Sequence, residues 1–87
     1  MRFDPKDPSD VLDYTINFTA LLEGDETITT ASFVVSRVTL DSSAHSNTSV
    51  TFWLSGGTPG DASVAVTITT SQGRTYERTA YLLIRNL

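Results

Sequence analysis

The chain has 87 residues, with ten acidic residues against six basic ones and a net charge of −4 at pH 7. This length allows one domain, and no apolar run approaches the ~20 residues that a membrane-spanning helix needs. The acidic balance argues against nucleic-acid binding, and without cysteine there is no disulfide and no thiolate metal site. Because apolar burial in so short a chain only about balances the entropy lost on folding, a lone monomer is expected to be marginally stable.

The apolar pattern predicts the elements in chain order. Residues 1–11 contain two prolines and no periodicity, which predicts an extended N-terminal arm ahead of a single domain over residues 12–87. From residue 12 to residue 22, apolar and polar residues alternate, which predicts a strand with one buried face. Residues 26–35 are strand-like, but Ile28 and Phe33 are five residues apart and cannot share a face without a bulge.

The second half of the chain predicts further strands. Val38 and Leu40 mark a short third strand, and the broken phase before it leaves two registers open over residues 26–40. Downstream we expect strands over residues 50–54, 62–69 and 80–85. The connections are expected to be a polar turn region over residues 41–48, a glycine-rich loop over residues 55–61 and a hairpin turn over residues 71–74. Six or seven strands with turns every ~8–12 residues predict an all-β sandwich or a small barrel.

No catalytic constellation stands out. The only histidine, His45, is followed by Ser and preceded by Asp41, but there is no nucleophile elbow and no glycine-rich oxyanion loop beside it. Residues 55–60 are glycine-rich but lack the Lys and the following helix of a phosphate-binding loop. We therefore predict no catalytic, cofactor-binding or metal-binding residues, and a protein that is not an enzyme.

Acidic residues are concentrated at the N-terminus. Four aspartates recur there at every third position: Asp4, Asp7, Asp10 and Asp13. Such carboxylates can bind Ca²⁺, but the alternating ligands, the turn glycine and the closing Glu of a calcium loop are missing. A solvated or partner-facing acidic arm is therefore favoured. Three arginines near the C-terminus are possible partners for it, within the chain or between chains: Arg74, Arg78 and Arg85.

Outward-facing aromatic residues suggest an interaction surface. Trp53, Tyr81, Leu83 and Leu21 lie out of phase with the predicted core faces, and exposed aromatic residues on a small β domain can mark an interface. The alternative is that the phase is reversed at Trp53, which would put this side chain in the core. Together with the arm, these residues form the candidate partner interface: Arg2, Phe3, Asp4, Asp7, Asp10, Trp53, Tyr81 and Leu83.

Two regions of the chain resemble a known family. They are Asp4–Tyr14 with Leu22–Ile28, and Val50–Gly60 with Val66–Arg74 and Glu77–Arg78. Together they resemble small virion proteins of tailed bacteriophages, described as phage-fibre-like. The resemblance implies an immunoglobulin-like β-sandwich of six to seven antiparallel strands, a structural role in the phage particle, and no catalytic residues or cofactors.

The resemblance leaves two roles open. We predict a capsid decoration (cement) protein that binds the outer head surface and stabilises it, with the arm reaching across a neighbouring subunit. The alternative is a fibre, neck or tail component, such as a head-fibre base, an adaptor or a host-recognition module. The expected partners are capsid or other virion proteins and further copies of this chain, with a trimer favoured, and neither nucleic acid nor a membrane. The protein would be made in the bacterial host cytoplasm and reside in the virion, on the capsid surface or in the tail and fibre assembly.

Overall fold

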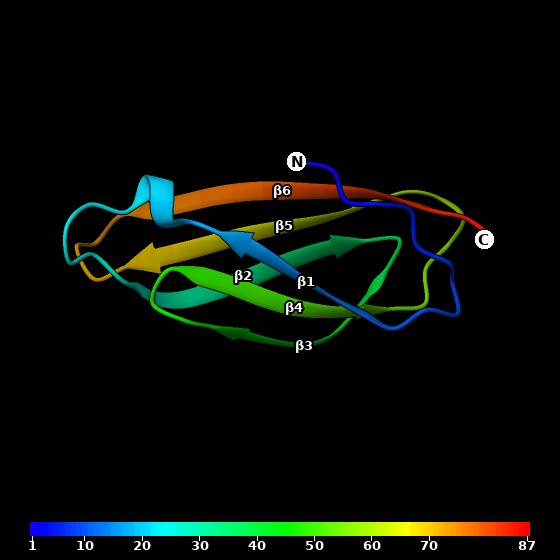
Figure 1. The fold of residues 1–87 in the computed structure, drawn as a ribbon, viewed down its shortest axis with the longest axis horizontal. Coiled ribbons are helices and arrows are strands. Elements are labelled where there is room, and N and C mark those ends of the chain that lie inside the picture. Colours follow the sequence, from blue (N-terminus) through cyan, green and yellow to red (C-terminus); the bar gives the residue numbers. More distant parts are fainter.

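The computed structural model describes residues 1–87 as two three-stranded antiparallel sheets packed face to face (Figure 1). One sheet has the strand order β1-β4-β3 and the other has the order β2-β5-β6. The strands are β1 (Leu12–Asn17), β2 (Ile28–Ser36), β3 (Thr39–His45), β4 (Ser49–Ser55), β5 (Gly60–Thr70) and β6 (Thr75–Ile84), and a 3₁₀ turn covers Thr19–Leu21. This confirms the all-β class and a sandwich of six strands, whereas the immunoglobulin-like connectivity stays a prediction of the resemblance.

The core lies between the two sheets. Strands β4 and β5, and the second half of β6, alternate between buried and more exposed positions, so each sends every second side chain there into the core. The side chains that these three strands bury are Val50, Phe52, Leu54, Ala62, Val64, Val66, Ile68, Ala80, Leu82 and Ile84. The faces predicted for these strands are therefore confirmed, and Trp53, at 42% exposed, points away from the core.

The prediction of one strand over residues 12–22 is wrong beyond Asn17. The side-chain oxygen of Asn17 accepts a hydrogen bond from the backbone N–H of Thr19 (2.8 Å), and this bond turns the chain into the short 3₁₀ segment. Phe18 is fully buried at the bend, and Leu21 packs against the core without being part of a strand. The alternating pattern therefore continues across a turn that the residue types alone do not reveal.

The predicted polar turn region over residues 41–48 is also wrong, because most of it is β3. This strand lies at the edge of its sheet and pairs only with β4, and all of its residues except Leu40 are exposed. An edge strand with no buried face leaves no apolar alternation in the sequence. The turn itself is short, with the Ser46 hydroxyl accepting hydrogen bonds from the N–H groups of Thr48 (3.3 Å) and Ser49 (3.1 Å).

A bulge resolves the two registers left open over residues 26–40. It lies between Ile28 and Thr30, so Ile28 is buried while Phe33 still packs on the core side further along β2. The chain then crosses from one sheet to the other at Arg37, which has a φ of 65°, in the left-handed region that non-glycine residues seldom adopt. Val38 enters the core immediately after this corner.

The two predicted glycine turns are present. In the hairpin between β5 and β6, Gly73 donates to the carbonyl of Thr70 (3.0 Å) and adopts a φ of 79°. In the loop between β4 and β5, Gly57 has a φ of 121°, and a Cβ there would lie 3.0 Å from the Ile84 side chain. β6 begins at Thr75, five residues before the predicted start at residue 80. None of these five residues is buried, so they show no apolar alternation in the sequence.

Candidate protein-binding surfaces

The first six residues lie along the free edge of β6. The N–H of Phe3 donates to the carbonyl of Tyr81 (2.8 Å), and the N–H of Lys6 donates to that of Leu83 (2.9 Å). The N–H of Arg85 returns a bond to the carbonyl of Lys6 (3.0 Å), so this segment pairs with β6 in parallel. Figure 1 shows the N-terminal chain running beside the end of β6. The arm thus covers an edge of its own sheet, and contact with a neighbouring subunit stays a prediction.

Phe3 holds this segment against the core. It is half-buried, and its ring centroid lies 4.7 Å from that of Tyr14 and 6.4 Å from that of Phe52. The Tyr14 hydroxyl oxygen is buried without a hydrogen-bond partner. Its desolvation, and then the nearby carboxylates of Asp10, Asp13 and Asp4 in that order, raise the pKa of Tyr14. Phe3, predicted as an interface residue, therefore has an evident packing role within the chain.

A buried lysine closes one end of the sandwich. The side chain of Lys6 is fully buried, and its Nζ donates to the carbonyls of Gly56 (2.6 Å) and Asp7 (2.9 Å). The Asp7 carboxylate accepts hydrogen bonds from the N–H groups of Leu87 (2.9 Å) and Ser9 (2.8 Å), and these bonds lower its pKa. These bonds connect the arm, the β4–β5 loop and the C-terminus. The Asp7 carboxylate, predicted as part of the partner interface, forms its hydrogen bonds within the chain.

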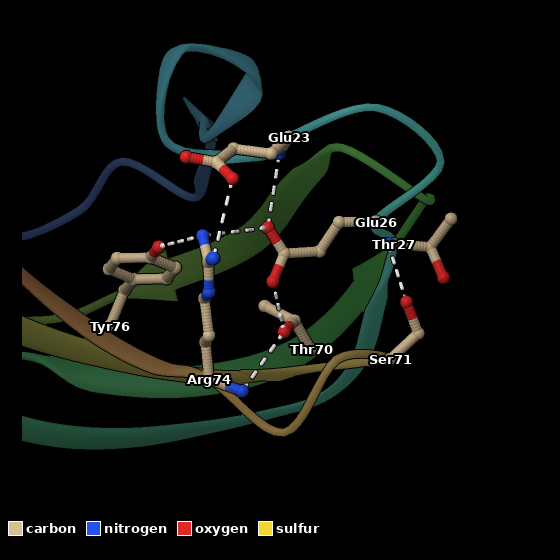
Figure 2. Close-up of polar contacts among 7 residues, drawn as sticks. All are labelled: Glu23, Glu26, Thr27, Thr70, Ser71, Arg74 and Tyr76. Carbon is tan, nitrogen blue, oxygen red and sulfur yellow. Dashed lines mark hydrogen bonds and ion pairs between the residues drawn. The ribbon is translucent and has the colours of Figure 1, made fainter.

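A second polar cluster closes the opposite end (Figure 2). The Glu26 carboxylate is buried; it accepts a hydrogen bond from the Thr70 hydroxyl (2.6 Å) and another from the N–H of Glu23 (3.1 Å). The Arg74 guanidinium lies 3.8 Å from Glu26 and 3.3 Å from the Glu23 carboxylate. The Thr70 bond, and after it the Glu23 N–H and Arg74, lower the pKa of Glu26 against the opposing effect of burial. This cluster ties the β1–β2 connection to the β5–β6 hairpin.

The predicted ion pairs between the acidic arm and the C-terminal arginines do not form within the chain. Arg74 is engaged by the two glutamates, and the arm's own cation Arg2 lies 3.8 Å from Asp61. Asp10 accepts a hydrogen bond from the N–H of Asp7 (3.3 Å), whereas Asp4 is exposed. No group of three or more histidine or acidic side chains lies close enough to hold a metal ion.

The outer surface of the β1-β4-β3 sheet is mainly polar, with one large aromatic residue; we call it the Trp53 face. Trp53 lies on the central strand, between Asp13 of β1 and Ser42 of β3. The hydroxyls of Thr15 and Thr51 lie 3.0 Å apart on the same face. A single half-exposed indole is therefore surrounded by short polar side chains.

The outer surface of the β2-β5-β6 sheet, the Tyr81 face, has a similar character. Tyr81 is 45% exposed and lies beside Ser63 of β5, which in turn lies beside Ser36 of β2. Leu83 is half-buried on the same face. Since the two sheets pack with their inner faces together, Tyr81 and Trp53 point in opposite directions. The predicted interface residues therefore form two separate surfaces and a docked arm, not one patch.

The rest of the surface offers little for small-molecule chemistry. His45 is exposed on β3, and its Nδ1 lies 3.1 Å from the carbonyl of the next residue, Ser46. The molecule has no pocket. No helix has the length and apolar character needed to cross a membrane. The candidate functional areas are the two outer sheet faces and the strand edges.

The roles of three residues were not predicted from the sequence. Lys6 and Glu26 are charged residues that become buried through partners far along the chain, at Gly56 and Thr70. Val34 lies between two hydrophobic residues, Phe33 and Val35, so the sequence does not show that its own side chain is 74% exposed on β2. Only Glu26 had a local signal of its role: it lies at the end of the turn sequence from Glu23 to Glu26, and its carboxylate accepts a hydrogen bond from the Glu23 N–H.

Comparison with known proteins gives one family. The model of the family described as Podophage GP4 fiber-tail adaptor protein gp77 matches residues 6–83. The matched range begins at the buried Lys6 and extends into β6, so it includes both outer faces. No curated protein matches the chain.

Proposed function

The chain belongs to the Gp77 family of podophage fiber-tail adaptor proteins, and on this premise we propose that it joins a fibre to the tail through its two opposite outer faces. Membership makes it a structural component of the virion's tail and fibre assembly and not an enzyme. The family therefore favours the fibre, neck or tail alternative over capsid decoration. In the proposal, the Trp53 face binds one of the two components and the Tyr81 face binds the other.

The arrangement of the two faces supports this proposal. An adaptor must contact two partners at once, so its two binding surfaces must not overlap. Trp53 and Tyr81 point away from each other across a sandwich whose shorter dimensions are 19 and 17 Å. Two partners bound on these faces would be separated by the thickness of the two sheets. This is the observation that carries the proposed function.

The composition of the faces supports protein binding in particular. Aromatic residues near the centre of a contact contribute a large share of binding energy when smaller neighbours exclude water around them. Trp53 is surrounded by short side chains such as Thr51 and Ser42, and Tyr81 by Ser63. Charged residues also border both aromatic residues: Asp13 lies opposite Trp53, and Arg2, which lies 3.8 Å from Asp61, pairs with Tyr81. These charges are exposed, so they can form a polar rim around each aromatic residue.

We expect the two end clusters to stiffen the adaptor. The Lys6–Asp7 cluster holds the ends of the chain at one end of the sandwich, and the Glu26 cluster holds two loops at the other. A rigid body between two partners loses little conformational entropy on binding. The proposed mechanism is therefore mechanical: the sandwich acts as a preformed spacer between fibre and tail.

Binding measurements with single substitutions test this function. We expect Trp53→Ala to weaken binding to one of the two components, fibre or tail, by about tenfold or more, while binding to the other is kept. Tyr81→Ala should produce the reverse pattern. Ser43→Ala, an exposed change on β3, is the matched control and should affect neither.

The pattern across the two partners decides the outcome. Purified fibre and tail proteins are immobilised separately, and each variant is titrated after its fold is checked by circular dichroism. Loss of the same partner in both variants would contradict the two-face arrangement. Unchanged binding of both variants to both partners would contradict any role of these faces.

A further inference from the structure

The four edge strands of the sandwich are protected unequally against pairing with other chains. The edge of β6 is covered along its second half by residues 1–6. The edge strand β3 carries Asp41 and His45 and is interrupted by a bulge. The edge strand β1 is short and carries Asp13. Covering segments, charges, bulges and short length are the usual means by which proteins keep strand edges from pairing.

The edge of β2 has none of these protections over most of its length. From Thr30 to Ser36 it pairs with β5 without interruption, and this stretch contains no proline and no charged residue. On the side away from β5, the backbone groups of this stretch make no backbone hydrogen bond within the chain. Val34 is 74% exposed, more than any other large hydrophobic side chain. The structure thus contains a regular, uncharged and open strand edge.

The core beside this edge is only partly covered. Ala31, Phe33 and Val35 point to the inner side of β2 and pack against the core, but each stays partly exposed. The Phe33 ring centroid lies 5.9 Å from that of the fully buried Phe52. A further strand beside β2 would cover these side chains and satisfy the open backbone groups together.

We propose that this edge binds a second copy of the chain by antiparallel pairing of β2 with β2. In a two-fold pairing centred on Phe33 the same stretch meets itself, so a charge near the centre of the stretch would lie close to the same charge of the second copy. The stretch from Thr30 to Ser36 has no charge, whereas the chain as a whole carries −4. Pairing centred on Phe33 sets Ala31 of one copy opposite Val35 of the other and keeps the inner faces in phase. The two β2-β5-β6 sheets become one sheet of six strands.

This pairing goes beyond the proposed function and does not depend on it. It is two-fold, so it favours a dimer over the trimer that the sequence suggested. The Tyr81 faces of the two copies would lie on one continuous sheet, and the two Trp53 faces would lie on its opposite side. Each partner would then meet two equivalent sites, which raises avidity without any new contact. A single strand pair is a small interface, so we expect a weak dimer in solution.

Sedimentation equilibrium of the purified chain over a range of concentrations tests the proposal. We expect a monomer–dimer equilibrium. In the pairing centred on Phe33, position 34 of one copy lies opposite Ser32 and diagonal to position 34 of the other, within reach of long side chains. We therefore expect Val34→Lys to raise the dissociation constant about fivefold, because the two lysines repel each other across the strands. Val34 is so exposed that the substitution should leave the monomer folded, which the thermal melting temperature checks. Ser43→Lys places the same charge on the exposed edge strand β3 and is the matched control, with no expected effect.

Mixing two variants distinguishes self-pairing from other contacts. Val34→Lys and Val34→Glu chains should each be mainly monomeric, and an equal mixture should recover the dimer because opposite charges then lie on the diagonal across the two strands, within reach of each other. A wild-type chain that stays monomeric throughout would overturn the proposal, as would a dimer or trimer unaffected by Val34→Lys. A monomer that binds fibre or tail protein, and loses this binding on Val34→Lys, would assign the edge to another chain. The sedimentation experiment measures the molar mass of the purified protein without fibre or tail protein. A result against the dimer therefore does not bear on the proposed adaptor role.

Discussion

Lys6, Glu26 and Tyr14 place polar groups in the interior in different ways. Lys6 and Glu26 are buried at opposite ends of the sandwich, and each has two or more hydrogen-bond partners. The Tyr14 hydroxyl has none. Buried charges are tolerated when their hydrogen bonds are satisfied, and a buried polar atom without a partner lowers stability. The three side chains should therefore respond differently to substitution.

Replacing Tyr14 with Phe should leave the protein as stable or make it more stable. The substitution removes a desolvated hydroxyl that makes no hydrogen bond, and it keeps the ring that stacks on Phe52 at 5.9 Å. An unsatisfied buried group costs about 1–3 kcal/mol, so a gain of up to about 1 kcal/mol is expected from this half-buried residue. Urea denaturation of the two proteins gives the difference. A loss above about 1 kcal/mol would show that the hydroxyl has a stabilising partner.

Glu26 should make stability depend on pH in the acid range. The pKa of Glu26 is lowered below its ordinary value of 4.5. The largest cause is the hydrogen bond from Thr70, followed by the hydrogen bond from the Glu23 N–H and the charge of Arg74. A carboxyl whose pKa is lower in the folded state stabilises the fold above the unfolded pKa, and this contribution is lost as the pH falls through the folded pKa. We expect stability to decrease as the pH drops below about 4.5.

The variant Glu26→Gln isolates this effect. Gln keeps oxygen and size but has no charge to titrate, so the variant should be less stable at about pH 7 and should lose less stability on acidification. Urea midpoints at about pH 7 and about pH 3 measure both differences. The pKa of Asp7 is also lowered, so part of the decrease should remain. Parallel pH curves for the two proteins would contradict the assignment to Glu26.

At the scale of elements, residues 1–6 pair with the edge of β6 and should contribute to stability as a short additional strand would. Phe3→Ala removes an aromatic ring that packs on Tyr14 and Phe52, and it should lower the free energy of unfolding by about 1–3 kcal/mol. Asp4→Ala changes the exposed neighbour and should alter stability by less than about 0.5 kcal/mol. Thermal melts compare them. Equal stability of the wild type and Phe3→Ala would mean that the segment does not pack as described.

The strands with a buried face were predictable from the sequence, and those without one were not. The inward positions of β4, β5 and β6 follow from strict alternation, because burial on one face imposes a period of two. β3 has only Leu40 partly buried, so nothing in its composition separates it from a polar turn. The turn after Asn17 was missed because the apolar residues that follow it keep the same phase by coincidence.

The candidate surfaces were predictable residue by residue but not as an arrangement. The outward direction of Trp53 and Tyr81 follows from the phase of their strands. Their separation onto opposite faces depends on the strand order of the two sheets, which no local pattern contains. The same limit applies to Lys6 and Glu26, whose burial depends on Gly56 and Thr70, far along the chain.

At the scale of the whole molecule, the sandwich is an elongated body of 43 × 19 × 17 Å with a polar cluster at each end. Its long sides are two outer sheet faces and two pairs of strand edges, of which only the β2 edge is open and uncharged over a long stretch. In the two proposals made above, the two faces bind the fibre and the tail, and the β2 edge binds a second copy. These properties agree with the role that the Gp77 family describes.

The most direct test of this account is the location of the protein in the phage particle. Purified virions are separated into heads and fibre-bearing tails, and the protein is quantified in each fraction by mass spectrometry against the major capsid protein. The account predicts recovery with the tails and fibres and absence from the heads. Recovery with the heads, in proportion to the capsid protein, would contradict the adaptor role and support capsid decoration instead.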